Sequence, residues 1–477
     1  MGPTPRRARP ALSAVAGLVP LPVVLLVGLV GSGLLAVGPD LPLVNAARNA
    51  DHAAVRSLLK GGVNVNAAEA DGTTALHWAS YRDDGEMVDL LIRAGATVNA
   101  ANDLGATPLW TACENGSAAM VRRLLQGGAD PNMTLLRGET ALMVAARSGN
   151  PDVVAQLLVK GARPNARGPR GQTALMWAVA QRHAGVVPVL LAHGADVHAR
   201  SDTWTQVMAV FPHGMLEYNR AIPHGADTAL LFAARVGDLA SAKHLVASGA
   251  SVSDADAWGV SATTMASHAG FGELVEFFLE MGADANAAAA GFTALHAAVV
   301  RRDERMVAAL LARGADPNAP IRTWTPTRRS SKDFNFEPPL VGATPYWLAA
   351  RFSEAGIMRM LLKQGADPQF VHHAAYHAGD PSVAVTQVTT PVMAATGMGG
   401  GAAWVRPARA EPEARMLEAV TLAAEQGVDL NAVNSDGRTA LDAATALKYR
   451  TVVAFLVAQG ATPGTAQPRP TLRPPID

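Results

Sequence analysis

Residues 138–165 read GETALMVAARSGNPDVVAQLLVKGARPN, and this stretch decides the fold. Its threonine, Thr140, can cap the start of an Ala-rich helix that we predict over residues 141–147. A Gly-containing turn leads to a second predicted helix over residues 153–160, which carries an apolar face. Gly161 then ends this helix in a left-handed cap. The stretch therefore predicts one helix-turn-helix unit.

The same unit recurs along the chain. The opening threonine stands at Thr74, Thr107, Thr140 and Thr173, 33 residues apart each time, and again at Thr228, Thr293, Thr344, Thr390 and Thr439. Ser261 holds the equivalent place between Thr228 and Thr293, and Leu41 marks a first unit. A glycine follows each opener by 21 residues, at Gly62, Gly95, Gly128, Gly161, Gly194, Gly249, Gly282, Gly314, Gly365 and Gly460; Gly427 follows Thr390 by 37. Two landmarks in one register indicate about eleven repeats.

One such helix pair cannot bury its apolar face alone, whereas stacked neighbours can. Residues 74–77 and 293–296 read TALH, and over residues 41–463 the sequence resembles the ankyrin-repeat family. The resemblance implies an all-α solenoid of about eleven helix-turn-helix repeats with short hairpin loops. Other residues replace the motif histidine, namely Trp110, Met143, Met176, Leu231, Trp347 and Asp442. We therefore expect apolar packing in place of most histidine-centred hydrogen bonds, and weaker stacking where Ser261 opens a degenerate seventh repeat.

Insertions interrupt the period at four places. Three fall in the predicted hairpin loops, at residues 200–225, 319–341 and 369–388, and therefore on one edge of the solenoid. The fourth, about residues 398–413, separates the two helices of the tenth repeat. The predicted organisation is repeats one to five over 41–199, six to eight over 226–318, nine to eleven over 342–463, and a disordered tail over 464–477.

The three loop insertions are rich in aromatic residues. They contain Trp204, Phe211, Tyr218, Trp324, Phe334, Phe336, Phe370 and Tyr376, about twice the number that the overall 5% of aromatics predicts. Aromatic side chains in long loops either hold the loop on the fold or form a contact surface. The sequence leaves both interpretations open, and the two can coexist.

The exposed end of each first helix is rich in arginine. The resemblance implies that partners bind to these helix ends and to the hairpin tips. The predicted contact residues on the helix ends are Tyr81, Arg82, Arg147, Arg235, Arg301, Arg351 and Phe352. Those in the insertions are Trp204, Phe211, Tyr218, Trp324, Arg328, Arg329, Phe334 and Phe336. Aromatic and arginine residues dominate binding hot spots, so we expect a protein or peptide partner, which the arginines favour as acidic.

Several other function classes are excluded or disfavoured. Acidic and basic residues number 40 each, so the chain has no net charge to attract nucleic acid. No phosphate loop, nucleophile elbow or zinc-protease helix is present, so we predict no enzyme and no cofactor. His373 and His377 would face one metal if helical, but exposed loop histidines are the preferred interpretation. The single cysteine, Cys113, is expected to be a packing residue.

The first 40 residues predict export. Three arginines, at positions 6, 7 and 9, precede a stretch without charge from Ala11 to about Val37. This pattern is typical of a signal peptide or of a signal anchor, and the sequence does not decide between them. Either would place the repeats outside the cytoplasm, in the periplasm or on the outer face of the inner membrane, with the membrane touched only by this segment.

The predicted function is therefore a non-catalytic scaffold that binds a protein or peptide in a concave groove with aromatic hairpin insertions. The alternative is a structural or regulatory subunit that is stably docked on a membrane or redox enzyme.

Overall fold

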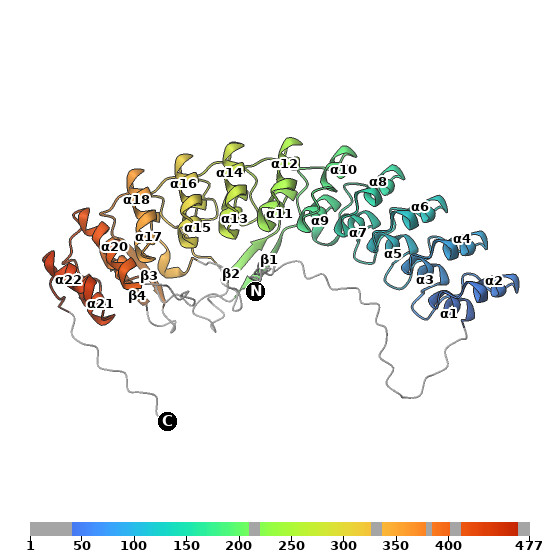
Figure 1. Cartoon of the computed structure of the whole chain (residues 1–477), viewed down its shortest axis with the longest axis horizontal. Coiled ribbons are helices and arrows are strands. Elements are labelled where there is room, and N and C mark those ends of the chain that lie inside the picture. The colour runs from blue at the N-terminus through green and yellow to red at the C-terminus, as the bar shows by residue number, and fades with distance from the viewer. Residues whose placement is uncertain (1–40, 209–219, 326–335, 378–383, 401–411, 466–477) are drawn as a thin grey trace, which may run out of the picture.

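The computed structural model describes residues 41–208, 220–325, 336–377, 384–400 and 412–465. These residues form 22 α-helices and two antiparallel β-hairpins. The helices stack in sequential pairs into a curved solenoid, with the first helix of each pair on the inner arc and the second on the outer arc (Figure 1). The predicted export segment, and the tail from residue 466 on, lie outside the described residues.

The inner helices are α1 (Pro42–Arg48), α3 (Ala75–Tyr81), α5 (Pro108–Glu114), α7 (Ala141–Ser148), α9 (Ala174–Ala180), α11 (Ala229–Val236), α13 (Ala262–Ala269), α15 (Ala294–Arg301), α17 (Pro345–Arg351), α19 (Pro391–Ala395) and α21 (Ala440–Ala446). The outer helices are α2 (His52–Lys60), α4 (Gly85–Arg93), α6 (Ala118–Gln126), α8 (Pro151–Val159), α10 (Val187–Ala192), α12 (Leu239–Ala247), α14 (Gly272–Glu280), α16 (Glu304–Ala312), α18 (Ala355–Lys363), α20 (Pro412–Glu425) and α22 (Arg450–Ala458).

The helix ends follow the repeated landmarks. The hydroxyl of Thr140 accepts a hydrogen bond from the Met143 amide at 3.2 Å, and Thr107, Thr173, Thr344 and Thr390 cap their helices in the same way. Gly161 has φ of 89° after helix α8, a conformation that costs glycine nothing. The threonine and glycine landmarks therefore mark the start of the inner helix and the end of the outer helix.

Asparagine side chains join the loops that follow the outer helices. The Asn132 amide donates to the Gly161 carbonyl at 2.9 Å, and its oxygen accepts from the Arg163 amide at 3.0 Å. Equivalent pairs of bonds are made by Asn66, Asn99, Asn165, Asn286, Asn318 and Asn431. His198 and Ser253 occupy the equivalent places after α10 and α12, and neither side chain makes this link within the described chain. The asparagine ladder is therefore interrupted at the middle of the arc.

The core is one continuous apolar layer between the two helix rows. Inner helix α7 buries six consecutive residues, from Ala141 to Ala146, because neighbours cover it on both sides. The expected weak stacking of the seventh repeat is not observed, since α13 also buries six residues, 262–267. Ser267 donates to the Ala294 carbonyl at 2.7 Å, so a polar side chain there still joins two repeats.

The replaced motif histidines behave as expected. His77 and His296 remain, and their Nε2 atoms donate to the carbonyls of Ala106 and Ala319 at 2.9 and 2.8 Å. In other repeats this place is filled by buried apolar side chains, among them Trp110, Met143, Met176, Leu231 and Trp347. Apolar packing therefore replaces the hydrogen bond.

The prediction of an all-α fold needs one correction. The first insertion forms strands β1 (Trp204–Met208) and β2 (Arg220–His224), and the third forms β3 (His372–His377) and β4 (Ala384–Thr389). Trp204 pairs with His224, and His372 pairs with Thr389, at the base of the two antiparallel ribbons. Both ribbons lie on the inner side of the arc (Figure 1). Antiparallel strands can bond to each other directly, so the described residues of these two insertions extend the ordinary hairpin.

Candidate protein-binding surface

The inner face carries the predicted helix-end contacts, but several of the arginines already hold neighbouring repeats together. Arg147 lies 3.4 Å from the Glu114 carboxylate and 5.4 Å from the Trp177 ring centroid. Arg301 donates to the His268 carbonyl at 2.9 Å, and Arg351 donates to the Gly399 carbonyl at 2.8 Å. These guanidinium groups therefore have a structural role as well as a surface position.

Two of the other helix-end contacts are more accessible. The Tyr81 side chain is 47% exposed and meets the edge of the Trp78 ring, with centroids 6.0 Å apart. Arg82 follows it at the end of α3 and is exposed. At the far end of the array, Phe352 is half-buried beneath the guanidinium of Arg302 at 5.4 Å. Tyr81 and Arg82 thus remain available to a partner on the inner face.

The first insertion presents a half-buried tryptophan at the base of its ribbon. The Trp204 ring is stacked on His224, with ring centroids 5.6 Å apart, and the Arg170 guanidinium lies 4.7 Å from its centroid. Beyond it, Val207 is 66% exposed, whereas Ile222 on the paired strand is 4% exposed. Phe211 and Tyr218, also predicted contacts, lie outside the described residues.

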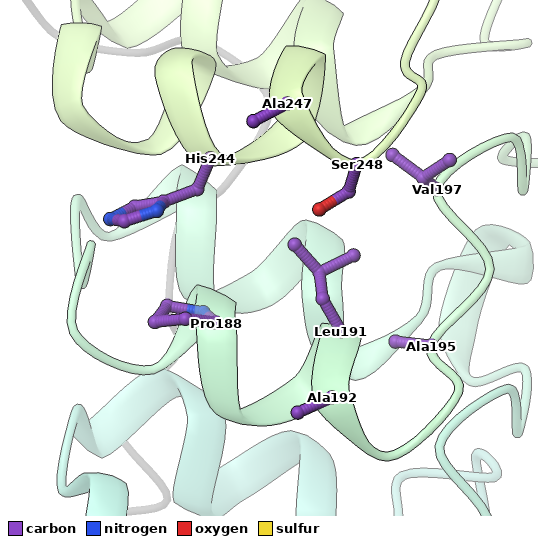
Figure 2. A pocket seen from close by; sticks show the side chains of 8 residues that line it. All are labelled: Pro188, Leu191, Ala192, Ala195, Val197, His244, Ala247 and Ser248. Atoms are coloured by element: carbon purple, nitrogen blue, oxygen red, sulfur yellow. The ribbon is translucent and has the colours of Figure 1, made fainter.

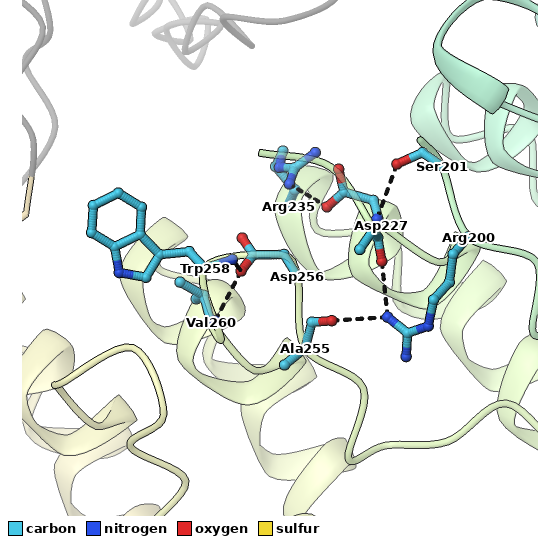
Figure 3. A network of polar contacts seen from close by, with 9 residues as sticks. Arg200, Ser201, Asp227, Arg235, Ala255, Asp256, Trp258 and Val260 are labelled. Atoms are coloured by element: carbon cyan, nitrogen blue, oxygen red, sulfur yellow. Dashed lines mark hydrogen bonds and ion pairs between the residues drawn. The ribbon is translucent and has the colours of Figure 1, made fainter. Parts of the chain in front are cut away.

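A polar network fixes the base of this ribbon to the following repeats (Figure 3). The Arg200 guanidinium donates to the carbonyls of Ala226 and Ala255 at 2.9 Å each, and pairs with Asp254 at 2.8 Å. Ser201 and Asp227 close the hairpin: the Ser201 amide donates to the Asp227 carbonyl at 2.9 Å, and the Asp227 amide donates to the Ser201 hydroxyl at 3.0 Å. The insertion is therefore clamped at its base.

The same network contains buried carboxylates. Asp227 pairs with Arg235 at 2.7 Å and is buried. Burial raises the pKa of Asp256, and the neighbouring Asp227 adds to the rise. The backbone amides of Trp258 and Val260 donate to the Asp256 carboxylate at 2.9 Å each, and these bonds oppose the rise in its pKa. Arg235, predicted to contact a partner, therefore serves first to neutralise a buried aspartate.

In the second insertion, the prediction for Phe336 is wrong. Its side chain is 1% exposed and packs on the Phe292 ring at 4.9 Å, so it belongs to the core. The backbone of Thr325 donates to the Phe336 carbonyl at 2.8 Å, which closes the base of the loop. Trp324, one residue earlier, is half-buried and remains a candidate contact. Arg328, Arg329 and Phe334 lie outside the described residues.

The third insertion also inserts a side chain into the array. His372 is fully buried, donates from Nε2 to the Val341 carbonyl at 3.0 Å, and lies 4.3 Å from the Trp347 ring. Burial lowers the pKa of His372. His373 and His377 lie on a strand, where four residues span about 13 Å, too far to share one metal ion. Within the described ranges no cluster of three metal-ligating side chains occurs.

The outer face has a pocket where α10 and α12 meet. Leu191 and Val197 form its apolar wall, and His244 and Ser248 face them across a space of about 380 Å³ (Figure 2). Small side chains at Ala192, Ala195 and Ala247 leave this space unfilled. None of the predicted contacts lies here.

No helix in the described part of the chain is long and apolar enough to cross a membrane. The stacked helix pairs and the ribbons on the inner arc define a helical repeat protein of the solenoid class. A family model described as ankyrin repeats (3 copies) matches residues 43–135, 119–201 and 230–321, together more than half of the 477 residues. The chain therefore belongs to the ankyrin-repeat family. A comparison with curated proteins found no match.

Proposed function

We propose that this protein is a non-catalytic scaffold that binds a protein or peptide on the inner face of its arc. Ankyrin repeats generally mediate protein–protein interaction, and the family is typically non-catalytic. The observation that carries the proposal is the position of the β1–β2 and β3–β4 ribbons, which exceed what stacking requires and extend from the inner side (Figure 1). Tyr81 and Arg82 are exposed, and Trp204 and Trp324 are half-buried, so these four residues can contact a partner.

We also propose that residues 1–40 export the chain, so that the repeats meet their partner outside the cytoplasm. The basic start and the long uncharged stretch support this placement.

Site-specific crosslinking in the native cell tests the binding proposal. A photo-reactive amino acid at Tyr81, Trp204 or Trp324 should give one shared crosslinked partner. The same group at Val159, 74% exposed at the end of outer helix α8, should give none. Equal crosslinking from Val159, or none from the inner positions, contradicts the proposal.

A salt wash separates the two kinds of partner. Reversible capture that is lost at high salt indicates a binding scaffold. A stoichiometric partner that survives the wash indicates a permanently docked subunit instead.

A further inference from the structure

The hairpin tips of neighbouring repeats form one continuous row. The Leu136 amide donates to the Leu104 carbonyl at 3.1 Å, and the Asp202 amide donates to the Arg170 carbonyl at 2.8 Å. Between these pairs, a Cβ built on Gly138 would lie 3.8 Å from the Arg167 carbonyl, so the two central tips are also in contact. We name the residues along this row the fingertip stripe: Leu104, Leu136, Arg137 and Arg170, which are exposed, and Trp204, which is half-buried.

One end of the fingertip stripe is apolar. Leu104 is 53% exposed and Leu136 is 77% exposed, and they lie on tips that are hydrogen-bonded to each other. Exposed leucines scattered singly need no explanation, but adjacent ones on a protruding row form a patch that a partner can cover.

The other end is basic. Arg137 and Arg170 are exposed, and within the described residues neither forms an ion pair. The nearby Asp202 carboxylate is already engaged by Arg167 at 2.7 Å. Arg170 also covers the Trp204 ring at 4.7 Å, so this end combines cations with an aromatic surface. In contrast, helix-end arginines such as Arg147 and Arg235 have carboxylate partners within the array.

We infer that the fingertip stripe binds an extended partner segment whose apolar residues lie on Leu104 and Leu136 and whose following carboxylates lie on Arg137 and Arg170. The order follows from the stripe itself, since the tip of Leu104 carries no cation, whereas the next two tips carry Arg137 and Arg170. This inference rests on the proposed function and adds to it the chemistry and the order of the bound segment.

Synthetic peptides test the inference on the full-length chain, purified in a mild detergent. The probe is a labelled peptide of about twelve residues with two leucines at one end and four glutamates at the other, followed by fluorescence anisotropy. Arg137→Gln with Arg170→Gln should weaken binding about fivefold, and added salt should reduce this difference. Leu136→Ser should weaken binding of the same peptide by a similar factor.

Pairwise coupling supplies the sharper result. Leu136→Ser should be non-additive with serine substitutions in the peptide's leucines and additive with glutamine substitutions in its glutamates; the double arginine variant should show the opposite pattern. The matched controls are Arg122→Gln on α6 and Val159→Ser on α8, both exposed on outer helices. Each variant's melting temperature is compared with the wild type.

The inference is overturned if the peptide fails to bind, if a scrambled peptide binds equally, or if the controls weaken binding as much as the stripe variants. A failure of this kind, with inner-face crosslinks still formed, leaves the proposed scaffold function intact. Loss of the inner-face crosslinks instead removes the scaffold function itself.

Discussion

Two buried histidines fix the start of their helices in the neutral form. The Nδ1 atom of His296 accepts the Thr293 amide at 3.0 Å, while Nε2 must carry the proton that it donates to Ala319. His77 makes the same two bonds with Thr74 and Ala106. A second proton on Nδ1 would displace the amide donor and put a charge in the core. Burial accordingly lowers the pKa of His296 to about 4 and also lowers that of His77.

This burial predicts a loss of stability in mild acid. The unfolded chain takes up a proton on His296 near pH 6.5, whereas the folded chain does so only near pH 4. The stabilising contribution is therefore complete above pH 6.5 and is lost as the pH falls to 4, on the order of 3 kcal/mol. We expect His296→Gln to melt lower at pH 7.5 but to lose less stability between pH 6.5 and 4. The measurement is the thermal midpoint across this range, with exposed His193→Gln as control; identical slopes for the two variants would refute the account.

The sequence alone predicts the roles of some residues but not of others. Thr140 and Gly161 were predictable because a cap and a left-handed turn depend on local backbone chemistry. Phe336 was not, because in a long loop no periodicity tells whether an aromatic ring turns toward the core or away from it. The excess of aromatic residues indicated that the insertion has a special role, but it did not distinguish the buried Phe336 from the half-buried Trp324.

At the scale of elements, the three loop insertions are anchored at the base, and the first and third form β-hairpins. Each contributes a buried side chain, namely Ile222, Phe336 and His372. Farther out, the ribbons expose residues such as Val207 and His373. The buried side chains support bracing at the base of each insertion, and we propose that the exposed residues farther out form the contact surface.

The second insertion allows these two roles to be separated. Phe336→Ala should destabilise the protein by about 3–5 kcal/mol, because it leaves a cavity against Phe292. The triple variant Trp324→Ala, Arg328→Ala, Arg329→Ala should leave the melting temperature nearly unchanged and weaken partner capture by about 2 kcal/mol or more. Calorimetry and quantitative capture with the crosslinked partner measure both. If the triple variant unfolds early and still binds, the insertion is a clamp only.

The first insertion predicts a local effect of its clamp. Arg200→Ala removes three bonds at the ribbon base and leaves two carbonyls and Asp254 without that donor, at a cost of about 1–3 kcal/mol. We expect faster hydrogen exchange at Ser201 and Asp227, with little change in the distant α3. Arg167→Ala, which loses a single exposed ion pair with Asp202, is the matched control. Equal exchange in both variants would show that the network does not hold the ribbon.

The bonds at the base of the first insertion could not be predicted from the sequence, although its position could. The excess length of residues 200–225 over the regular period predicts an insertion on a hairpin loop, and strands β1 and β2 lie within this range. The strands could not be predicted from the sequence, because β1 and β2 are short and the Ala-Ile-Pro-His segment of β2 has no clear alternation of apolar and polar residues. The partners of Arg200 lie up to 55 residues away, and only the stacking of repeats brings them together.

At the scale of the whole molecule, stability is distributed over similar interfaces. Each inner helix contacts the inner helices on either side, and most outer helices do likewise. No single interface holds the arc together, as is usual for stacked repeats.

Removal of one complete repeat should therefore be tolerated. Deletion of residues 107–139 joins the tip before Thr107 to the cap at Thr140, which opens a helix of the same kind. We expect circular dichroism to show retained helix in proportion to length and a lower melting temperature. A global loss of helix would contradict independent stacking units.

The proposed export is tested by a fusion. Residues 1–45 joined to a reporter that is active only outside the cytoplasm should give activity, because basic residues retain the start of the segment inside. The control replaces Arg6, Arg7 and Arg9 with glutamate and should lower activity at equal expression. A silent wild-type fusion would refute the proposed location.

We expect the unfilled space between α10 and α12 to make the arc bend unevenly along its length. A solenoid changes its curvature when outer helices approach or part, and closely packed side chains resist this motion. Here about 380 Å³ is open, and the asparagine link is missing at this junction, where His198 stands, and at the next, where Ser253 stands, whereas Asn165 still bonds to Gly194 on the α8 side. We therefore expect the array to bend more readily between α10 and α12 than at its other junctions, although the bonds of Arg200 to Ala226 and Ala255 still tie the loops there. Bending between α10 and α12 would change the curvature of the inner face to fit partners of different width, and the other repeats would keep their shape.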